Sequence, residues 1–475
     1  MISLIGKERL KMAKRVLINT YNNDGIVDFT QALEQKFGYD IVATDVSYDY
    51  LCGNGLSATK FDWNDATFDI VVCNFYPFEK LKNKEAEEDE VLNLVDTQGL
   101  SLLQKAAKAY KTTLSVSSPK QYEDVLKKLE DESIDENYSK KLAQKATLAI
   151  CKANSALAAV LGEKEDTISF SEEKIYDLTY GENPHQKASL YTGDMVSYEV
   201  IANKKLSYNN ILDIDTATAI AAEFYDVCAV VITRHAMPCA VALGSSIEDA
   251  YNKAVDCDPI SAFGGIAAFT KKIDAQMAKK LSSLFLEIII APDFDEETIE
   301  TLANTNVKLI KLNTPLKDYK AYLDKDIKIT PFGTLVQEYD KSALEKDSFK
   351  LVSKKKPTTE IVEDMVFAWK VAKHARSNAA VIVKDLRTVG ISQGQANRLE
   401  AIDIALDKAC ENSKDAILAT DGFMSSIESI QDAAQGRIAA IIQPGGSPKD
   451  QEIIKTADKY ELTMIMTGIR QFKNR

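Results

Sequence analysis

The sequence predicts an α/β protein with a doubly wound parallel sheet near its N-terminus and two further α/β subdomains after it. Short apolar runs alternate with helical patterns between residues 15 and 160, and a second mixture of strand and helix patterns follows residue 185. The charged stretch at residues 162–166 lies between these regions and is typical of a linker. The predicted domains are residues 1–163 and 164–475, and the second is divided into subdomains at about 164–350 and 351–475.

The first region alternates predicted strands with predicted helices. Short apolar strand patterns lie at residues 15–18, 40–43 and 69–73. Helical patterns lie at residues 25–33, 99–110 and 139–161, and the last of them is rich in alanine. Strands and helices that alternate in this way form a parallel, doubly wound sheet.

The second region consists of two halves that resemble each other. Arg234-His235 opens the first half, which ends in residues 264–269, and Lys373-His374 opens the second half, which ends in residues 436–443. Each half pairs a cation and a histidine with a later Ile-Ala-Ala strand pattern. We predict from this pairing that the halves are related subdomains.

Composition and charge argue against several classes of protein. A net charge of −13 argues against general nucleic-acid binding but allows an anionic small molecule in a local cationic pocket. There is no apolar run of membrane-spanning length and no secretory signal, so we expect a cytoplasmic protein that does not bind membranes. The seven cysteines are dispersed without a Cys-x-x-Cys motif, which favours reduced thiols. No ligand spacing indicates a metal site.

The chain has only three histidines, and all of them lie at the edges of predicted elements. His185 follows the turn-forming dipeptide Asn183-Pro184 and precedes a strand pattern at residues 189–191. A histidine on such a turn can contact a ligand, or it can simply bond to its own loop. Packing histidines more often lie inside an apolar periodicity, so we treat His185 and His235 as candidate functional residues.

Seven motifs occur in an order that is characteristic of one enzyme family. They are Tyr180-Gly-Glu-Asn-Pro-His-Gln186, Leu206-Ser-Tyr-Asn-Asn-Ile-Leu-Asp213, Arg234-His-Ala-Met-Pro-Cys239, Asp258-Pro-Ile-Ser-Ala-Phe-Gly-Gly265, Lys373-His-Ala-Arg-Ser-Asn378, Gly394-Gln-Ala-Asn-Arg398 and Gln443-Pro-Gly-Gly446. Here the chain resembles the purine-biosynthesis family that joins aminoimidazole carboxamide ribonucleotide (AICAR) formyltransferase to inosine monophosphate (IMP) cyclohydrolase, and seven ordered motifs are far more specific than one. The resemblance implies a methylglyoxal-synthase-like first domain, two cytidine-deaminase-like subdomains, and a homodimer with active sites between its subunits.

The resemblance also implies a reaction, which transfers a formyl group from 10-formyltetrahydrofolate to AICAR. His235 is the candidate for proton transfer, because neutral imidazole can accept the amine proton near pH 7. Arg234 is the adjacent cation at a position that is usually Lys in the family, and Arg is planar, bulkier and effectively never deprotonated. Asn378 is the candidate amide donor to the formyl oxygen, and His185 is a supporting hydrogen-bond partner.

The implied substrate contacts include two arginines. Arg398 and Arg470 are expected to bind the ribotide phosphate, since arginine pairs with phosphate through two parallel hydrogen bonds. Thr179 stands where the family has Arg, and Ser392 and Gln393 stand where it has Gly and Ala. The remaining implied nucleotide contacts are Tyr180, Ser207, Tyr208, Asn210, Asp213, Phe263, Gly264 and Gly265.

The implied folate contacts are Phe423, Glu428 and Asn378. The family's loop carries a Pro and a final Phe that this chain lacks, and Glu428 replaces the usual Asp. We therefore expect an altered apolar slot for the pterin.

The first domain lacks motifs that a cyclohydrolase needs. Ala43-Thr-Asp-Val-Ser47 replaces a Ser-Thr-Gly-Gly-Thr phosphate loop, and a Lys-Thr-Leu-His-Pro loop has no counterpart. Tyr76, Asp96 and Lys108 still match catalytic positions. We predict a structural or dimerisation remnant without cyclohydrolase activity.

Three interpretations follow. The favoured one is a monofunctional AICAR formyltransferase with a vestigial cyclohydrolase-like domain. The second is a non-catalytic or regulatory purine-ribotide-binding relative, which Arg234, Thr179 and the altered folate loop motivate. The third is a still-bifunctional enzyme with a rebuilt first site.

Overall fold

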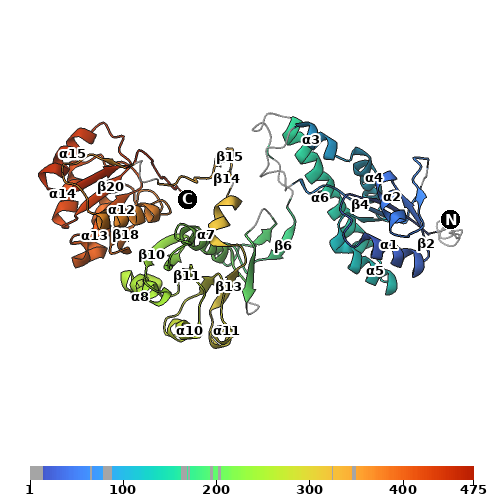
Figure 1. Cartoon of the computed structure of the whole chain (residues 1–475), viewed down its shortest axis with the longest axis horizontal. Helices are drawn as coiled ribbons and strands as arrows, with labels where there is room; N and C mark the ends of the chain where they lie inside the picture. Colours follow the sequence, from blue (N-terminus) through green and yellow to red (C-terminus); the bar gives the residue numbers. More distant parts are fainter. Residues whose placement is uncertain are drawn as a thin grey trace. The chain divides into compact units, whose positions relative to one another are not determined.

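The computed structural model forms two compact units, Met1–Glu173 and Lys174–Arg475 (Figure 1). The predicted linker at residues 162–166 lies outside the described residues. The structure describes residues 14–64, 67–78, 88–161, 168, 172–192, 196–201, 205–323, 325–344 and 349–474.

The first unit contains a five-stranded parallel sheet in the order β3-β2-β1-β4-β5. Its strands are β1 (Lys14–Thr20), β2 (Tyr39–Ala43), β3 (Thr59–Lys60), β4 (Ile70–Asn74) and β5 (Leu114–Val116). Its helices are α1 (Ile26–Gln35), α2 (Asp45–Gly53), α3 (Glu88–Leu94), α4 (Thr97–Lys108), α5 (Tyr122–Glu130) and α6 (Glu136–Leu161). The predicted alternation of strands and helices is confirmed.

Alternation along β1 explains why helices cover both faces of this sheet. Val16 and Ile18 pack in a cluster with Phe29 of α1. Leu17, which points to the opposite face, packs in a second cluster with Leu103 of α4. Because successive strand residues face opposite sides, a strand that is apolar at every position needs cover on both, and the predicted doubly wound arrangement follows.

The second unit is built on one mixed sheet of 12 strands, in the order β16-β21-β20-β19-β17-β18-β10-β9-β11-β12-β13-β8. Its first half contributes β8 (Tyr198–Ile201), β9 (Ala229–Arg234), β10 (Met237–Leu243), β11 (Ile266–Phe269), β12 (Ile288–Ala291) and β13 (Lys308–Leu312). Its second half contributes β16 (Lys350–Leu351), β17 (Ala380–Lys384), β18 (Arg387–Ser392), β19 (Ile417–Thr420), β20 (Ala440–Gln443) and β21 (Thr463–Met466). Two small hairpins, β6 (Lys174–Asp177) with β7 (Ser189–Tyr191) and β14 (Lys325–Thr330) with β15 (Gly333–Glu338), lie outside it.

The two halves repeat the same order of elements around the junction of β10 with β18. Helix α7 (Tyr208–Ala222) precedes the β9–β10 hairpin, and α12 (Thr359–Ala372) precedes the β17–β18 hairpin. The first half continues with α8 (Ile247–Cys257), α9 (Pro259–Ala262), α10 (Ala275–Leu281) and α11 (Glu296–Ala303), and the second with α13 (Arg398–Ala409), α14 (Ile427–Gln435) and α15 (Asp450–Lys459).

The order of elements is the same in both halves, but the predicted correspondence of Arg234-His235 with Lys373-His374 was wrong. Arg234 ends β9 and His235 begins the turn of a hairpin, so their counterparts are Lys384 and Asp385 at the β17–β18 turn. Lys373 instead follows α12. A cation followed by a histidine occurs in both halves, but it lies at the end of a strand in the first half and at the end of a helix in the second. The short sequence similarity therefore pairs positions that are not equivalent in the structure.

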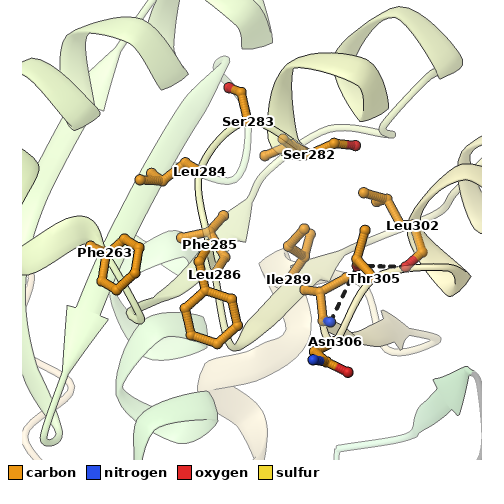
Figure 2. A pocket seen from close by; sticks show the side chains of 12 residues that line it. Phe263, Ser282, Ser283, Leu284, Phe285, Leu286, Ile289, Leu302, Thr305 and Asn306 are labelled. Atoms are coloured by element: carbon orange, nitrogen blue, oxygen red, sulfur yellow. Dashed lines mark hydrogen bonds between the residues drawn. The ribbon is translucent and has the colours of Figure 1, made fainter.

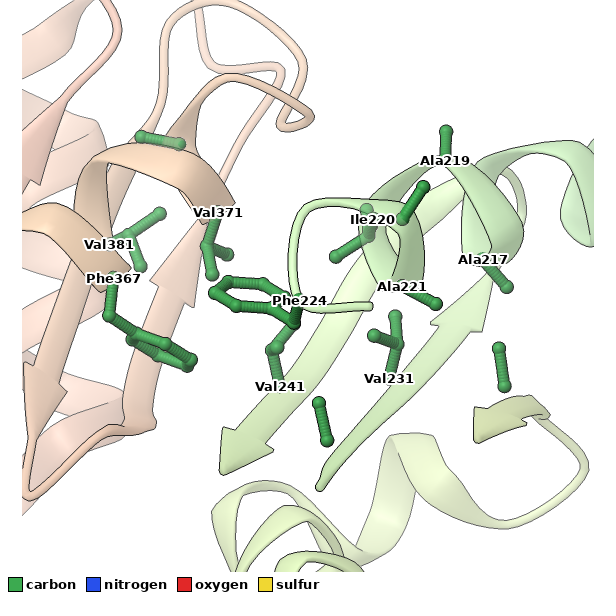
Figure 3. Packing of buried hydrophobic residues seen from close by; sticks show 14 of the residues in the cluster. Ala217, Ala219, Ile220, Ala221, Phe224, Val231, Val241, Phe367, Val371 and Val381 are labelled. Carbon is green, nitrogen blue, oxygen red and sulfur yellow. The ribbon is translucent and has the colours of Figure 1, made fainter. Parts of the chain in front are cut away.

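Three apolar clusters hold the sheet between its helices. One cluster spans both halves, and in it the rings of Phe224 and Phe367 lie 5.1 Å apart. Figure 3 shows Phe224 between Val241 of the first half and Val371 of the second. The opposite face carries a separate cluster in each half.

Candidate active site

One edge of the 12-stranded sheet gathers the candidate residues from both halves. Thr233 of β9 pairs with Ile266, which places the turn after β9 beside the glycines that precede β11. In the second half, Ala380 pairs with both Ser392 and Thr420, so Asn378 lies near the ends of β18 and β19. The side-chain amide of Gln393 donates to the carbonyl of Pro238 (2.8 Å) and joins the two halves at this edge.

His235 lies on a tight hairpin turn in a left-handed backbone conformation. His235 and Ala236 both have a φ of 54°, which a two-residue hairpin of this type requires at both positions. The Ala236 N–H donates to the carboxylate of Asp213 on α7. The imidazole of His235 is exposed, so the turn presents it outward while its backbone is bound from behind.

Asp213 is therefore placed beneath the turn. It is 9% exposed, and burial raises its pKa against the opposing effects of the Ala236 N–H and the nearby His235. Its carboxylate binds the backbone of the His235 turn, and its contact with the nucleotide stays a prediction.

Arg234 fixes the loop that carries Phe263. Its guanidinium donates to the Phe263 carbonyl at 2.9 Å. Gly264 has a φ of 75°, and its N–H donates to the carbonyl of Phe285 (2.7 Å). A Cβ on Gly265 would lie 3.1 Å from the Ala262 carbonyl oxygen, so the sequence has glycine where the turn and the close approach need it.

Phe263 borders an apolar cavity of about 320 Å³. Its ring is 57% exposed and lies 5.5 Å from that of Phe285 (Figure 2). The cavity is lined by Phe263, Leu281, Ser282, Ser283, Leu284, Phe285, Leu286, Ile289, Leu302, Thr305, Asn306 and Val307.

The start of α7 holds the Tyr180 segment. Ser207 caps the helix by accepting from the N–H of Asn210, and the Asn210 side chain accepts from the Ser207 N–H in return. The Asn210 amide also donates to Glu287 at 2.7 Å. The Tyr208 N–H donates to the Tyr180 carbonyl (3.1 Å). Asn210 is thus engaged within the protein, while the rings of Tyr180 and Tyr208 remain exposed.

His185 lies on the loop that follows Tyr180. This loop closes on itself, because the N–H of Asn183 donates to Gln186 Oε1 at 2.8 Å. Asn209 of α7 donates to the Glu182 carbonyl at 3.2 Å, which brings the loop to the start of α7. His185 itself is exposed.

In the second half, a fully buried carboxylate organises the candidate residues. Asp421, at 0% exposure, accepts from the Ala379 N–H and from Arg398, both at 2.9 Å. Arg398 also donates to the Phe423 carbonyl (2.9 Å). Asn378 donates to the Gln395 carbonyl at 3.0 Å. These bonds hold the predicted amide donor, arginine and folate loop in one network.

Arg470 departs from its prediction. The strand that precedes it, β21, is buried as predicted. Gly468 then turns the chain with a φ of 70°. Arg470 is therefore exposed, although the prediction held it inward. Its guanidinium lies 4.5 Å from the ring centroid of Phe472, and that of Arg398 lies 5.8 Å from the same ring. The two predicted phosphate ligands therefore meet at Phe472.

The second predicted folate contact is also on the surface. Glu428 is exposed and accepts from the Ser426 hydroxyl at 2.5 Å, which lowers its pKa. Phe423 is half-buried.

Comparison with known proteins identifies the family. The sequence profile of the AICARFT/IMPCHase bienzyme family matches residues 106–408. The bifunctional purine biosynthesis protein PurH of Petrotoga mobilis is 36% identical over 519 aligned positions, which cover 98% of this chain and 100% of the relative. PurH of Caldicellulosiruptor saccharolyticus is 36% identical over 520 positions with the same coverage. A crystal structure titled ForH shares 18% identity, covers 32% of this chain and 100% of that chain, and has a TM-score of 0.29, too low for a structural inference.

The chain belongs to the AICARFT/IMPCHase bienzyme family. The alignment with the Petrotoga PurH is longer than the 475 residues of this chain, so that relative has segments that this chain lacks. The family profile begins to match only at residue 106.

In the first unit of this family member, polar side chains at the carboxyl edge of the sheet bond to one another. Asn19 at the end of β1 donates to Asp96 at 2.6 Å and to the Cys73 sulfur at 3.3 Å, and it accepts from Thr44 at 2.5 Å. A Cβ on Gly99 would overlap with Asp96 and Asn19. In a parallel sheet, ligands bind at this carboxyl edge, and here side chains fill it.

The three matched catalytic positions of the first unit do not form one cluster. Asp96 caps the start of α4 by accepting from the Gly99 N–H, whereas Lys108 is the last residue of that helix. Twelve helical residues span about 18 Å. Tyr76 packs instead against Tyr21, with ring centroids 5.1 Å apart.

His374, the third histidine, is a packed residue that follows α12. It is 5% exposed, and its Nε2 lies 3.4 Å from Glu223, which also pairs with Lys320 and Lys373. Burial lowers the pKa of His374. A histidine at the end of a helix can thus be a packed residue.

Sequence patterns missed several residues that organise this edge. Asp421, Gln393 and Phe472 each bind partners far away in the sequence. Asp421 offered one local signal, since a carboxylate directly after an apolar strand is a frequent position for a site residue.

The part of the chain that the structure describes contains no cluster of metal-binding side chains and no helix that could cross a membrane.

Proposed function

We propose that this chain is an AICAR formyltransferase, which transfers a formyl group from 10-formyltetrahydrofolate to AICAR and so acts in IMP biosynthesis in the cytoplasm. Similarity to bifunctional PurH proteins over nearly the whole chain supports an enzyme of purine biosynthesis. The observation that carries the formyltransferase assignment is the His235 turn. It presents an exposed imidazole at the same sheet edge as Asn378 and is bound from behind by Asp213.

In the proposed reaction, the AICAR amine nitrogen attacks the formyl carbon, and the bond from that carbon to N10 of the folate then breaks. His235 accepts the amine proton and returns it to N10, which balances the transfer. The formyl oxygen becomes an oxyanion in the tetrahedral intermediate, and Asn378 and Arg234 are the proposed donors to it. In this structure Asn378 donates to Gln395 and Arg234 to Phe263, and each side chain has further N–H groups that can donate to the oxyanion.

The proposed phosphate site lies around Phe472, where Arg398 and Arg470 meet. Arg398 also binds Asp421, so Arg470 has the freer guanidinium. Tyr180, Ser207, Tyr208 and the Phe263 loop are the proposed nucleotide contacts. Phe423 and Glu428 are the proposed folate contacts.

We further propose a homodimer with active sites between subunits. On the candidate edge, Phe263 is 57% exposed, Phe472 44% and Tyr208 40%, and an edge with so many open aromatic rings fits a partner surface. We also propose that the two halves of the second unit are cytidine-deaminase-like and that the first unit is methylglyoxal-synthase-like.

We propose that the first unit has no cyclohydrolase activity. Its carboxyl edge is closed by the bonds of Asn19, Thr44 and Asp96, and Lys108 lies at the far end of α4. The lack of a counterpart to the Lys-Thr-Leu-His-Pro loop supports this proposal.

A non-catalytic ribotide-binding relative is the second candidate function. The engagement of Arg234 with Phe263 and of Asn210 with Glu287 favours it, because the predicted catalytic cation and the predicted nucleotide contact both have internal partners. A still-bifunctional enzyme is the third candidate.

One assay separates these functions. Purified protein is incubated with AICAR and 10-formyltetrahydrofolate, and both tetrahydrofolate and IMP are followed. We expect tetrahydrofolate and formyl-AICAR without IMP above the uncatalysed rate, and loss of a general base in His235→Ala should lower the formyl-transfer rate by ~10²–10⁴. Binding of AICAR without turnover would indicate the regulatory relative, and rapid IMP formation the bifunctional enzyme.

A further inference from the structure

Gln393 joins the two halves of the sheet where the candidate residues lie. It directly follows β18, and its Nε2 donates to the Pro238 carbonyl of β10 at 2.8 Å. Its Oε1 accepts from the backbone N–H of Arg376 at 3.3 Å. One side chain thus binds a strand of the first half and the segment before β17 of the second.

The contact with Pro238 lies three residues from His235. The register of β9 and β10 shifts between Pro238 and Ala240, and such a shift interrupts the hydrogen-bond ladder of a hairpin. The Gln393 amide supplies a donor to the Pro238 carbonyl at this interruption. It therefore binds the base of the His235 hairpin from the side opposite to β9.

The contact with Arg376 lies two residues before Asn378. The Gly394 N–H donates to the Arg376 carbonyl at 2.9 Å, so residues 393 and 394 bind both backbone groups of Arg376. The segment that carries Asn378 is thereby held at the end of β18.

We propose that Gln393 is a positioning residue, which fixes the His235 hairpin relative to Asn378 across the junction of the two halves. This inference rests on the proposed formyl transfer, for which base and oxyanion donor must be placed together. Gln393 is half-buried, and at such a position a hydrogen bond between neutral groups contributes only about 0.5–1.5 kcal/mol to folding, whereas a displacement of about 1 Å at a reaction centre can lower the rate ~10²-fold. Loss of Gln393 should therefore affect turnover far more than stability.

The same junction offers a matched control. Thr388 of β18 accepts from the Val241 N–H at 3.0 Å and donates to the Val241 carbonyl at 3.2 Å, so it also joins the two halves. It lies five residues before Gln393 and is fully buried. Thr388→Val removes a cross-junction contact away from the candidate edge.

The test compares Gln393→Ala, Gln393→Glu and Thr388→Val in the full chain. We expect Gln393→Ala to lower kcat by about 10- to 100-fold, with KM for AICAR and Tm close to wild type. Gln393→Glu keeps an acceptor for Arg376 but places a carboxylate against the Pro238 carbonyl, so it should lower kcat as well. Thr388→Val should lower Tm and leave kcat close to wild type.

A second measurement does not depend on activity. The chain has only three histidines, so their imidazole proton signals can be assigned by NMR with single substitutions. Gln393→Ala should shift the His235 signal, and Thr388→Val should leave it in place. An inactive wild-type protein would overturn the proposed function, and the His235 signal would still report on the hairpin. An active wild type with normal kcat and an unchanged His235 signal in Gln393→Ala would overturn the positioning role alone, as would an equal loss of kcat in Thr388→Val.

Discussion

Arg398 and Arg470 are two residues of one type whose partners give them different tasks. Arg398 is bound to the fully buried Asp421 and to the Phe423 carbonyl, with 12% of its side chain exposed. Arg470 is exposed and contacts the ring of Phe472. A substitution of Arg398 therefore affects folding and binding together, whereas a substitution of Arg470 isolates binding.

Arg470→Ala should weaken AICAR binding by about 10- to 150-fold, the equivalent of ~1.5–3 kcal/mol for a charge-assisted contact. Its stability should be almost unchanged, because an exposed cation–π contact contributes only ~0.5–1 kcal/mol. Arg398→Ala should in addition destabilise the protein by ~3–5 kcal/mol, since it leaves a buried carboxylate unpaired. Calorimetric titration with AICAR and with its dephosphorylated nucleoside, together with denaturant unfolding, measures both effects. Equal losses for nucleotide and nucleoside in Arg470→Ala would exclude a phosphate contact.

Asp213 gives a pH-dependent prediction at the same scale. Burial raises its pKa in the folded protein, so the folded state binds its proton more tightly than the unfolded state, whose carboxyl titrates near pH ~3.9. The stability that wild type derives from this group is then fully present below the unfolded pKa and is lost as pH rises through the folded pKa. Asp213→Asn does not titrate, so its Tm relative to wild type should rise as the pH is raised through this range. A Tm difference that is constant with pH would show that Asp213 is not perturbed.

Local elements were predictable from the sequence, but the contacts between them were not. The strands β1, β2 and β4 and the helices α4 and α6 are confirmed because apolar spacing is a local property. The exposure of Arg470 depends on a turn at Gly468 and on a ring at Phe472, and the alignment of the two halves depends on the pairing of distant strands. Partners of this kind leave no periodic pattern in the chain.

The carboxyl edge of the first unit shows what such distant contacts do to a site. Asn19, Thr44, Cys73 and Asp96 come from four different segments and bond together at the C-terminal ends of β1, β2 and β4. Burial raises the pKa of the Cys73 thiol to about 12, so this cysteine stays protonated and unreactive.

Asn19→Ala should destabilise the first unit by ~1–3 kcal/mol, because it leaves the Asp96 carboxylate and the Thr44 hydroxyl without their shared partner. Formyl transfer should continue at the wild-type rate if the second unit holds the reaction centre. Denaturant unfolding and the tetrahydrofolate assay measure the two effects. A large loss of formyl transfer in a folded variant would assign a catalytic part to the first unit.

At the scale of the whole molecule, the 12-stranded sheet makes the two halves of the second unit dependent on each other. β10 pairs with β18, and one apolar cluster contains residues from both halves. A chain that ends at residue 344 would leave Phe224 and Val241 without Phe367 and Val371.

Residues 174–344 expressed alone should therefore aggregate or remain partly unfolded, whereas residues 174–475 should fold cooperatively. Circular dichroism and thermal unfolding of the two fragments check this expectation. A cooperative transition in the shorter fragment would show that each half is an independent folding unit.

The contact between a helix carboxylate and the backbone of a hairpin turn occurs in both halves of the second unit. Asp213 is the sixth residue of α7 and accepts from the Ala236 N–H, and Asp364 is the sixth residue of α12 and accepts from the N–H groups of Asp385 and Leu386. All four turn residues have a φ of 54°. Both turns share the contact that shapes them, but only one carries a histidine. The Asp385-Leu386 turn lies at the opposite edge of the sheet, so the same backbone support serves an exposed imidazole in one half and a plain chain reversal in the other.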